Sequence, residues 1–197
     1  MKDLLTLSVI LLLGWALLHP APKADWHGQR APQDPQQTVE DLPSAWDLKN
    51  FTVTPRARYS IQALVLSKHS YWAGLPEDSL AYYDLALGWG PLSDAAVISR
   101  LDISQGGRWY QYNWSGEPPV DPGAIITHSA NNHIIPADQE VFRTIERIKR
   151  YDVVTLEGYL VDVADRKRDW HWSTSLTRAD SGGGSCELFW VTSAVIE

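Results

Sequence analysis

DVVTLEGYLVDV, residues 152–163, is the stretch that decides the fold predicted for this chain. Apolar and polar side chains alternate along it, which is the period-two pattern of a β-strand. Asp152 precedes the alternating residues, and Gly158 lies among them, where a glycine allows a strand to bend sharply. The stretch therefore predicts a bent strand in a curved sheet.

Strand patterns also lie on both sides of this stretch. ARYSIQALVL at 57–66 alternates in the same way, and so does RWYQYNW at 108–114. Two further strands are predicted at 169–177 and 186–196, with the glycine-rich residues 181–185 between them. Most of the domain is therefore expected to be β-sheet.

One segment has the pattern of a substantial helix. PADQEVFRTIERIKR, residues 136–150, begins with a proline, has acids in its first turn and bases in its last, and repeats apolar residues on one face. A shorter helix, capped by Ser93 or Asp94, is expected to end near Arg100. The predicted fold class is α+β leaning to all-β. It comprises a small antiparallel sheet or partly closed barrel with one main helix at about 136–150, preceded by an N-terminal membrane segment.

The beginning of the chain predicts that membrane segment. Leu4 to Leu18 form an unbroken apolar run, which as a helix would span about 22 Å. That length lies between a signal-peptide core and a full membrane span. The flank at 19–24 lacks small residues at both positions that a signal peptidase requires. A signal anchor is therefore favoured, and a cleaved signal peptide stays open as the alternative.

The residues behind the apolar run predict a linker. Residues 20–46 are mostly polar and contain Pro20, Pro22, Pro32, Pro35 and Pro43. Such a tract buries too little apolar surface to offset its conformational entropy, so it would act as a semi-extended spacer. The predicted organisation is residues 1–19 as signal anchor or signal peptide, 20–46 as proline-rich linker and 47–197 as a single globular β-rich domain.

Charge and cysteine content narrow the possible partners. The formal net charge is −7, and Lys2 and Asp3 cancel, so the exported part keeps all of it. An acidic domain is poorly suited to nucleic acid, where affinity comes mainly from lysine and arginine on phosphates, so no nucleic-acid partner is predicted. Cys186 is the only cysteine, which excludes an internal disulfide.

HSANNH, residues 128–133, is the first candidate site. Its two histidines are five positions apart, whereas a helical zinc motif needs four and a strand needs an even spacing, so neither a metal site nor a cofactor is predicted. His128, Asn131 and His133 are expected to bond the backbone of a turn ahead of the helix. A polar ligand pocket made by the same three residues is the alternative.

Tryptophans are the second candidate. Most are expected in the core, because each buries a large apolar area. Trp170 and Trp172 share one face of their strand, and the adjacent aromatics at 109 and 110 point opposite ways, so some of these rings are expected to face solvent or a ligand. The candidate contacts are Trp89, Trp109, Trp170 and Trp172.

Two other residues have a chemical and a structural interpretation. Arg178, before the glycine run, would hold an anion with the help of backbone amides, or it would simply belong to a glycine-rich turn. Cys186 would be a nucleophile with His128 or His133 as base, or a small buried residue at the start of a strand. The structural interpretation is favoured for both.

Two resemblances add to these patterns. The stretch from Asp152 through Gly158 is similar to the opening of OB-type barrels, which implies a small closed barrel for the C-terminal part. The segments at 84–94 (DLALGWGPLSD), 108–114 (RWYQYNW), 128–138 (HSANNHIIPAD) and 172–187 (WSTSLTRADSGGGSCE) together resemble a family of single-anchor bacterial envelope proteins with no established activity. This second resemblance implies one bacterial domain and carries no catalytic residues over.

The patterns predict a membrane-anchored exported domain that binds an envelope protein or another envelope component. A metal- or cysteine-assisted hydrolase using His128, His133 and Cys186 is one alternative, and a polysaccharide-binding module is another. The predicted location is the bacterial inner membrane, with a single pass at residues 4–18 and the C-terminal domain in the periplasm. Cleavage of the first residues would instead give a periplasmic or secreted protein.

Overall fold

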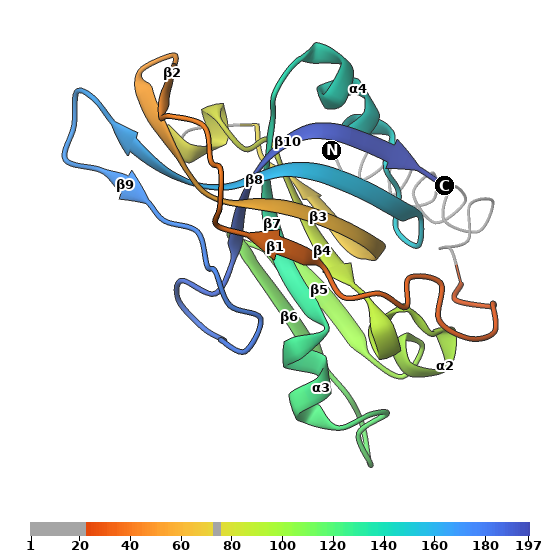
Figure 1. Cartoon of the computed structure of the whole chain (residues 1–197). Coiled ribbons are helices and arrows are strands. Elements are labelled where there is room, and N and C mark those ends of the chain that lie inside the picture. Colours follow the sequence, from red (N-terminus) through yellow and green to blue (C-terminus); the bar gives the residue numbers. More distant parts are fainter. Residues whose placement is uncertain (1–22, 73–75) are drawn as a thin grey trace, which may run out of the picture.

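The computed structural model describes residues 23–72 and 76–197, and Figure 1 shows how they are arranged. The elements are β1 Gln36–Thr38, β2 Trp46–Leu48, β3 Phe51–Ser70, η1 Pro76–Ser79, β4 Tyr83–Gly88, η2 Gly90–Ser93, α2 Ala95–Ile98, β5 Asp102–Gly106, β6 Trp109–Asn113, α3 Pro122–Thr127, β7 Ser129–Pro136, α4 Gln139–Arg147, β8 Val153–Asp165, β9 His171–Trp172 and β10 Glu187–Ile196. The predicted membrane segment at 4–18 lies outside the described residues. Within those residues, no helix is both long and apolar enough to cross a membrane.

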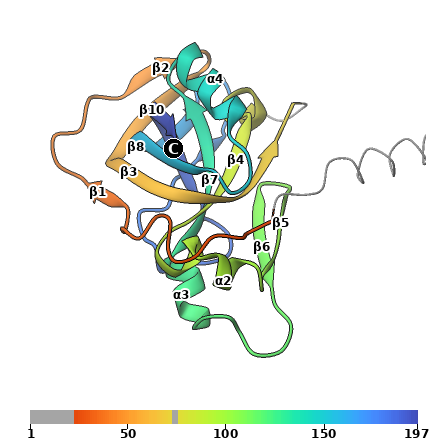
Figure 2. The ribbon, with the colours of Figure 1, turned by 90° about the vertical axis from the view of Figure 1, so that its right-hand side faces the viewer.

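Five strands close into a ring, which Figures 1 and 2 show from two sides. β3 pairs with β4, β4 with β7, β7 with β10, β10 with β8, and β8 again with β3. The short strands β1 and β2 add to β3, β9 adds to β8, and β5 and β6 form a separate hairpin. The predicted α+β class leaning to β is confirmed. The predicted antiparallel sheet is wrong in one pairing, because β7 and β10 run parallel.

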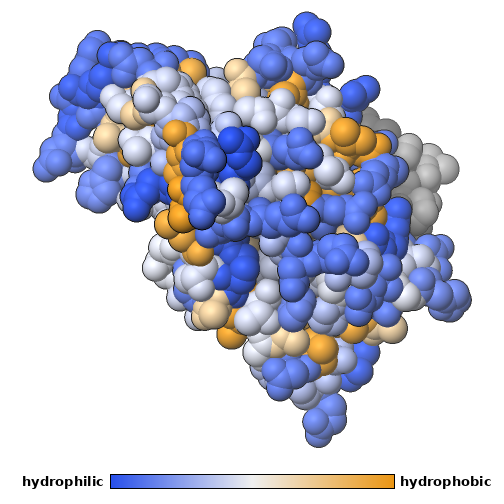
Figure 3. Space-filling model, viewed as in Figure 1, coloured by the Kyte–Doolittle hydropathy of each residue, from blue (hydrophilic) through white to orange (hydrophobic). Residues whose placement is uncertain are grey.

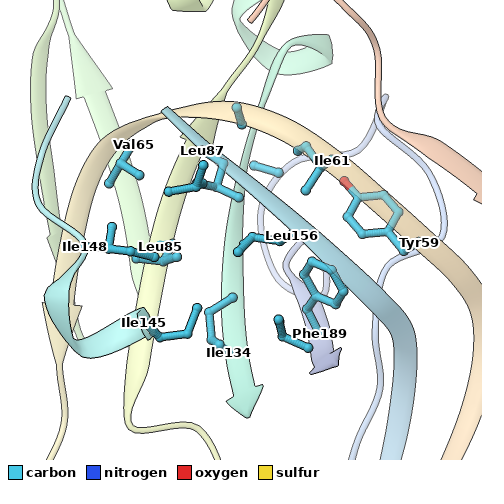
Figure 4. Packing of buried hydrophobic residues seen from close by; sticks show 14 of the residues in the cluster. Tyr59, Ile61, Val65, Leu85, Leu87, Ile134, Ile145, Ile148, Leu156 and Phe189 are labelled. Atoms are coloured by element: carbon cyan, nitrogen blue, oxygen red, sulfur yellow. The ribbon is translucent and has the colours of Figure 1, made fainter. Parts of the chain in front are cut away.

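Apolar side chains fill the inside of this ring, and Figure 4 shows them pointing toward one another. The labelled residues are Tyr59, Ile61 and Val65 from β3, Leu85 and Leu87 from β4, Ile134 from β7, Leu156 from β8, Phe189 from β10, and Ile145 and Ile148 from α4 and its end. The helix was predicted from Pro136 but begins three residues later, at Gln139, where the Asp138 carboxylate accepts the N–H groups of Glu140 and Val141 at 2.9 Å. Its apolar face packs into the same core as the strands.

Gly158 serves a close approach between two strands. It lies opposite Val191 of β10, its φ is +157°, and a Cβ added there would lie 1.9 Å from the carbonyl oxygen of Trp190. Any side chain would force β8 and β10 apart, so the ring requires glycine at this position.

The stretch around HSANNH differs from its prediction. Residues 129–136 do not form a turn ahead of the helix. They form β7, which is paired with β4 on one side and β10 on the other. Asn131, Asn132 and His133 are buried there although all three are polar. The local pattern does not indicate this strand, because Asn131 and His133 find their partners in segments far along the chain. The predicted strand 169–177 is also shorter, since only His171–Trp172 pair with β8.

Part of the segment predicted as a linker packs against the domain. The Trp26 indole N–H donates to the Ser93 carbonyl at 3.0 Å, and the Gly90 N–H donates to the Ala31 carbonyl at 2.8 Å. Ala31 is fully buried, and β1 pairs with β3. The tract is held by long-range hydrogen bonds to its polar backbone, which its proline-rich composition does not reveal. These contacts hold Trp26, Ala31 and β1 against the domain, so those parts of the tract are not a free spacer.

Candidate functional site

A cleft of about 420 Å³ lies on the outer side of the ring, beside β7. The turn of the β5–β6 hairpin contributes Arg108 and Trp109 to its walls, and the segment around β9 contributes Trp170 and Trp172. His133 of β7 also lines it. Trp109 is 48% exposed, which is unusual for so large an apolar ring and leaves its surface free for contact.

A cluster of buried charges lies next to this cleft. The Arg108 guanidinium donates to Asp78 Oδ1 and to Asp84 Oδ1, each at 2.6 Å, and to the Ala81 carbonyl at 2.8 Å. Its Cζ lies 3.7 Å from the centre of the Tyr71 ring. Asp84 is fully buried, and such a carboxylate is tolerated only with charged or hydrogen-bonding partners. Arg108 therefore fastens the hairpin turn to β4 and η1.

His133 connects this cluster to the cleft. Its Nδ1 lies 2.9 Å from Asp84 Oδ1, although the two atoms are not aligned as a hydrogen bond. The Trp172 ring also packs against the imidazole, with 4.6 Å between ring centres and a tilt of 44°. The imidazole thus contacts both a carboxylate and an indole, and it supports the Trp172 ring at the cleft.

Asn131 lies on the same face of β7 as His133 and is hydrogen-bonded to the β5–β6 hairpin. Its side-chain oxygen accepts a hydrogen bond from Gln105 Nε2 at 2.7 Å, and its amide donates to the Arg108 carbonyl at 3.1 Å. The same amide lies 3.6 Å from Cys186 Sγ. Asn131 is therefore occupied by structural contacts, which link the hairpin, β7 and the start of β10.

Cys186 lines the cleft as a protonated thiol. Burial raises the pKa of this thiol to about 11, with smaller contributions from nearby acids, Glu187 first among them. A cysteine nucleophile requires the opposite shift, because the thiolate is the reactive form. The environment of Cys186 therefore does not favour covalent catalysis.

This environment predicts slow alkylation. At neutral pH, Cys186 in the folded chain is expected to react with iodoacetamide at least about tenfold more slowly than in the urea-unfolded chain, because less of it is thiolate. Mass spectrometry of samples quenched over time would measure both rates. A folded chain that reacts as fast as the unfolded one would contradict this view of the site.

Arg178 and Glu187 form an ion pair at one end of the ring. The Arg178 guanidinium contacts the Glu187 carboxylate, and its Nη1 lies 3.4 Å from the Tyr59 hydroxyl. Burial raises the pKa of Glu187 to about 8, in spite of the arginine beside it. Arg178 thus has an internal partner in place of the external anion considered from the sequence.

A second, smaller hollow of about 100 Å³ adjoins the cleft near this ion pair. Trp109, Gly182 and Cys186 line both hollows. Asn131 and Arg178 also line the smaller one. In comparisons with protein-family models, curated proteins and solved structures, no match to this chain is found. The resemblance to a bacterial envelope family therefore stays a prediction.

The structure brings together six of the eight residues singled out from the sequence. Asn131, His133, Trp109, Trp170, Trp172 and Arg178 line one or both of the adjoining hollows. His128 and Trp89 lie elsewhere, with 6.4 Å between their ring centres. Trp89 is buried, and its indole N–H donates to Asp34 at 3.1 Å. Among the described residues, no group of three or more His, Cys, Asp or Glu side chains is arranged to hold a metal ion.

Sequence reasoning missed the charged residues beside the cleft. Asp84 stands alone among apolar residues in YDLALG, residues 83–88. A single acid in a buried strand indicates an internal charge with a partner, so Asp84 is the residue from which the buried ion pair could be predicted. Arg108, its partner, carries no such signal, because a basic residue in a hairpin turn is ordinary.

Proposed function

We propose that this chain is a non-enzymatic binding domain of the bacterial envelope whose cleft at Trp172 takes a saccharide component. The observation that carries the proposal is the gathering of Trp109, Trp170 and Trp172 around one cleft. Indole rings offer broad flat apolar faces, and sugar rings present matching faces with hydroxyls at their edges. Ser173 and His171, exposed in the same cleft, supply polar partners for such hydroxyls.

We also propose that the ring is a variant of the OB-type barrel. Those barrels are five-stranded, and ligands contact their second and third strands and the loops after their first and fourth strands. Counted along this chain, the second and third strands of the ring are β4 and β7. The cleft takes Glu77 from the loop after the first strand, His133 from β7, and Trp172 from the segment after the fourth. This correspondence supports ligand binding at the cleft.

Charge and surface polarity favour a neutral, hydroxylated ligand over nucleic acid or a large apolar partner. The net charge of −7 opposes phosphate-rich ligands. The face seen in Figure 3 is mostly hydrophilic, and its apolar residues appear as small separate areas. Large apolar patches usually mark protein-binding surfaces, and the apolar areas on this face are small.

The membrane anchor and the periplasmic location complete this proposal. The support for both is the apolar run at residues 4–18. An anchored domain would meet envelope saccharides on the exported side of the membrane. The hydrolase alternative receives less support, because His128 lies away from the cleft and Cys186 has a raised pKa.

The proposal predicts saccharide binding that depends on Trp172. The full chain is titrated with soluble peptidoglycan glycan fragments and with β-1,4-linked N-acetylglucosamine oligomers, and tryptophan fluorescence reports binding. Trp172→Ala is expected to weaken binding at least about tenfold, because a central aromatic contact is lost.

Arg166→Ala serves as the matched control, since Arg166 makes an exposed ion pair with Asp47. This variant should bind like the unaltered chain. Failure of every fragment to bind the unaltered chain would contradict the proposal, and so would equal affinity of Trp172→Ala.

A further inference from the structure

Alternate residues of β7 line three separate hollows in sequence order. Asn131 lines the smaller hollow, His133 lines the central cleft, and Ile135 lines a third hollow of about 520 Å³. Residues two apart on a strand point to the same face, so these three side chains form one row on the outside of the ring.

The row extends along most of the barrel. Residues on a strand advance about 3.4 Å each, so the six steps from Ser129 to Ile135 cover about 20 Å. Ser129 belongs to the lining of the smaller hollow and Ile135 to that of the third. Figure 1 shows β7 running from α3 at one end of the molecule to α4 at the other. This distance exceeds what a single sugar ring occupies.

The smaller hollow adjoins the central cleft, and η1 lies between the cleft and the third hollow. The smaller hollow and the central cleft share Trp109 and Cys186 in their linings. The central cleft and the third hollow lie on either side of η1, which contributes Glu77 to the first and Ser79 to the second. One short helix therefore separates those two hollows.

The third hollow has an exposed aromatic platform of its own. Trp72 is 63% exposed, and its ring lies 5.6 Å from that of Tyr82, which in turn lies 5.8 Å from Phe142. Lys49 reaches across, with its Nζ bonded to the Ser79 carbonyl at 2.7 Å. An exposed indole beside a polar group repeats the combination found in the central cleft, where Trp109 is exposed.

We infer that these three hollows form a groove along β7, interrupted at η1, that binds a glycan chain of several sugar units. This inference rests on the proposed saccharide binding and specifies its ligand as a polymer. Trp172 and Trp109 contact the middle of the chain, and Trp72 contacts units toward α4. The affinity therefore increases with chain length until the third hollow is filled.

The test measures affinity against chain length. The dissociation constants of β-1,4-linked N-acetylglucosamine mono-, di-, tetra- and hexasaccharides are measured by calorimetry for the full chain, for Trp72→Ala and for Val39→Ala. Val39 is exposed and lines none of the three hollows, which makes it a matched apolar control. Because Trp72 is largely exposed, its variant is expected to fold.

The expected result is a hexasaccharide bound more than about tenfold more tightly than the disaccharide, a gain of about 1.4 kcal/mol. Trp72→Ala should remove this gain and leave the disaccharide affinity unchanged, while Val39→Ala should keep it. A disaccharide that binds as tightly as the hexasaccharide in the unaltered chain would overturn the groove and leave the proposed function standing. Absence of binding by every saccharide would overturn both.

Discussion

Asp84→Ala is expected to lower the free energy of unfolding by about 3–5 kcal/mol. The Asp84 carboxylate is fully buried and accepts a hydrogen bond from the Arg108 guanidinium at 2.6 Å. His133 Nδ1 lies 2.9 Å from the same carboxylate oxygen. Removing Asp84 leaves the buried arginine charge with only one of its two carboxylate partners, which costs far more than the loss of an exposed pair. Urea unfolding followed by circular dichroism would measure the difference.

The matched control is the exposed pair between Arg166 and Asp47. Asp47→Ala is expected to change stability by less than about 1 kcal/mol, because solvent screens both charges. The buried cluster would lose its assigned role if Asp84→Ala were no more destabilising than Asp47→Ala. Arg108 also lines the cleft, so this ion pair contributes to the stability of the cleft wall as well as of β4.

Gly158→Ala is the second substitution with a large expected effect. The new Cβ would lie 1.9 Å from the Trp190 carbonyl oxygen and 3.0 Å from its carbonyl carbon, and both are backbone atoms that cannot rotate away. The strands β8 and β10 must separate, so a loss of about 3 kcal/mol or more is expected. The melting temperature, followed by far-ultraviolet circular dichroism, is the appropriate measurement.

Gly183→Ala is the corresponding control, because a Cβ there meets no atom within 4 Å. Its stability should change by no more than about 0.5 kcal/mol. Equal melting temperatures for the two variants would show that the β8–β10 approach is looser than described.

Local patterns predicted the elements whose partners are nearby in sequence. The helix α4 is predicted from the acids of its first turn, the bases of its last and its apolar face, and β6 from the alternation in RWYQYNW. The pattern of β8 alone marks Gly158 as the point where the strand bends, without reference to its neighbour Trp190. In each case the signal depends on residues within one element, which a single sequence displays.

The elements that were missed depend on distant partners. β7 contains Asn131, Asn132 and His133. Polar residues of this kind are stable in a buried strand mainly when other segments supply hydrogen-bond or charged partners for them. The Asn131 side chain accepts a hydrogen bond from Gln105 and contacts the Cys186 sulfur, and these residues lie 26 and 55 positions away. The packing of Ala31 against Ser93 is equally non-local. Periodicity within a window carries no information about these contacts.

The candidate site was predicted in its aromatic part and missed in its charged part. Trp170 and Trp172 share a face by simple alternation, and they do lie close, with 6.2 Å between ring centres. The pairing of Arg108 with Asp84 joins a hairpin turn to a ring strand, so no spacing rule relates the two residues. His128 was grouped with His133 by proximity in sequence, whereas β7 carries His133 away from the end of α3.

We propose above all that a glycan binds in the cleft at Trp172. The most direct test is the nuclear magnetic resonance spectrum of the indole N–H groups of the ¹⁵N-labelled full chain, recorded while the N-acetylglucosamine hexasaccharide is added. The indole signals of Trp109, Trp170 and Trp172 are expected to shift in proportion to binding, and those of the packed Trp26 and Trp89 to stay in place. Shifts confined to Trp26 and Trp89, or no shift at any indole, would contradict the account.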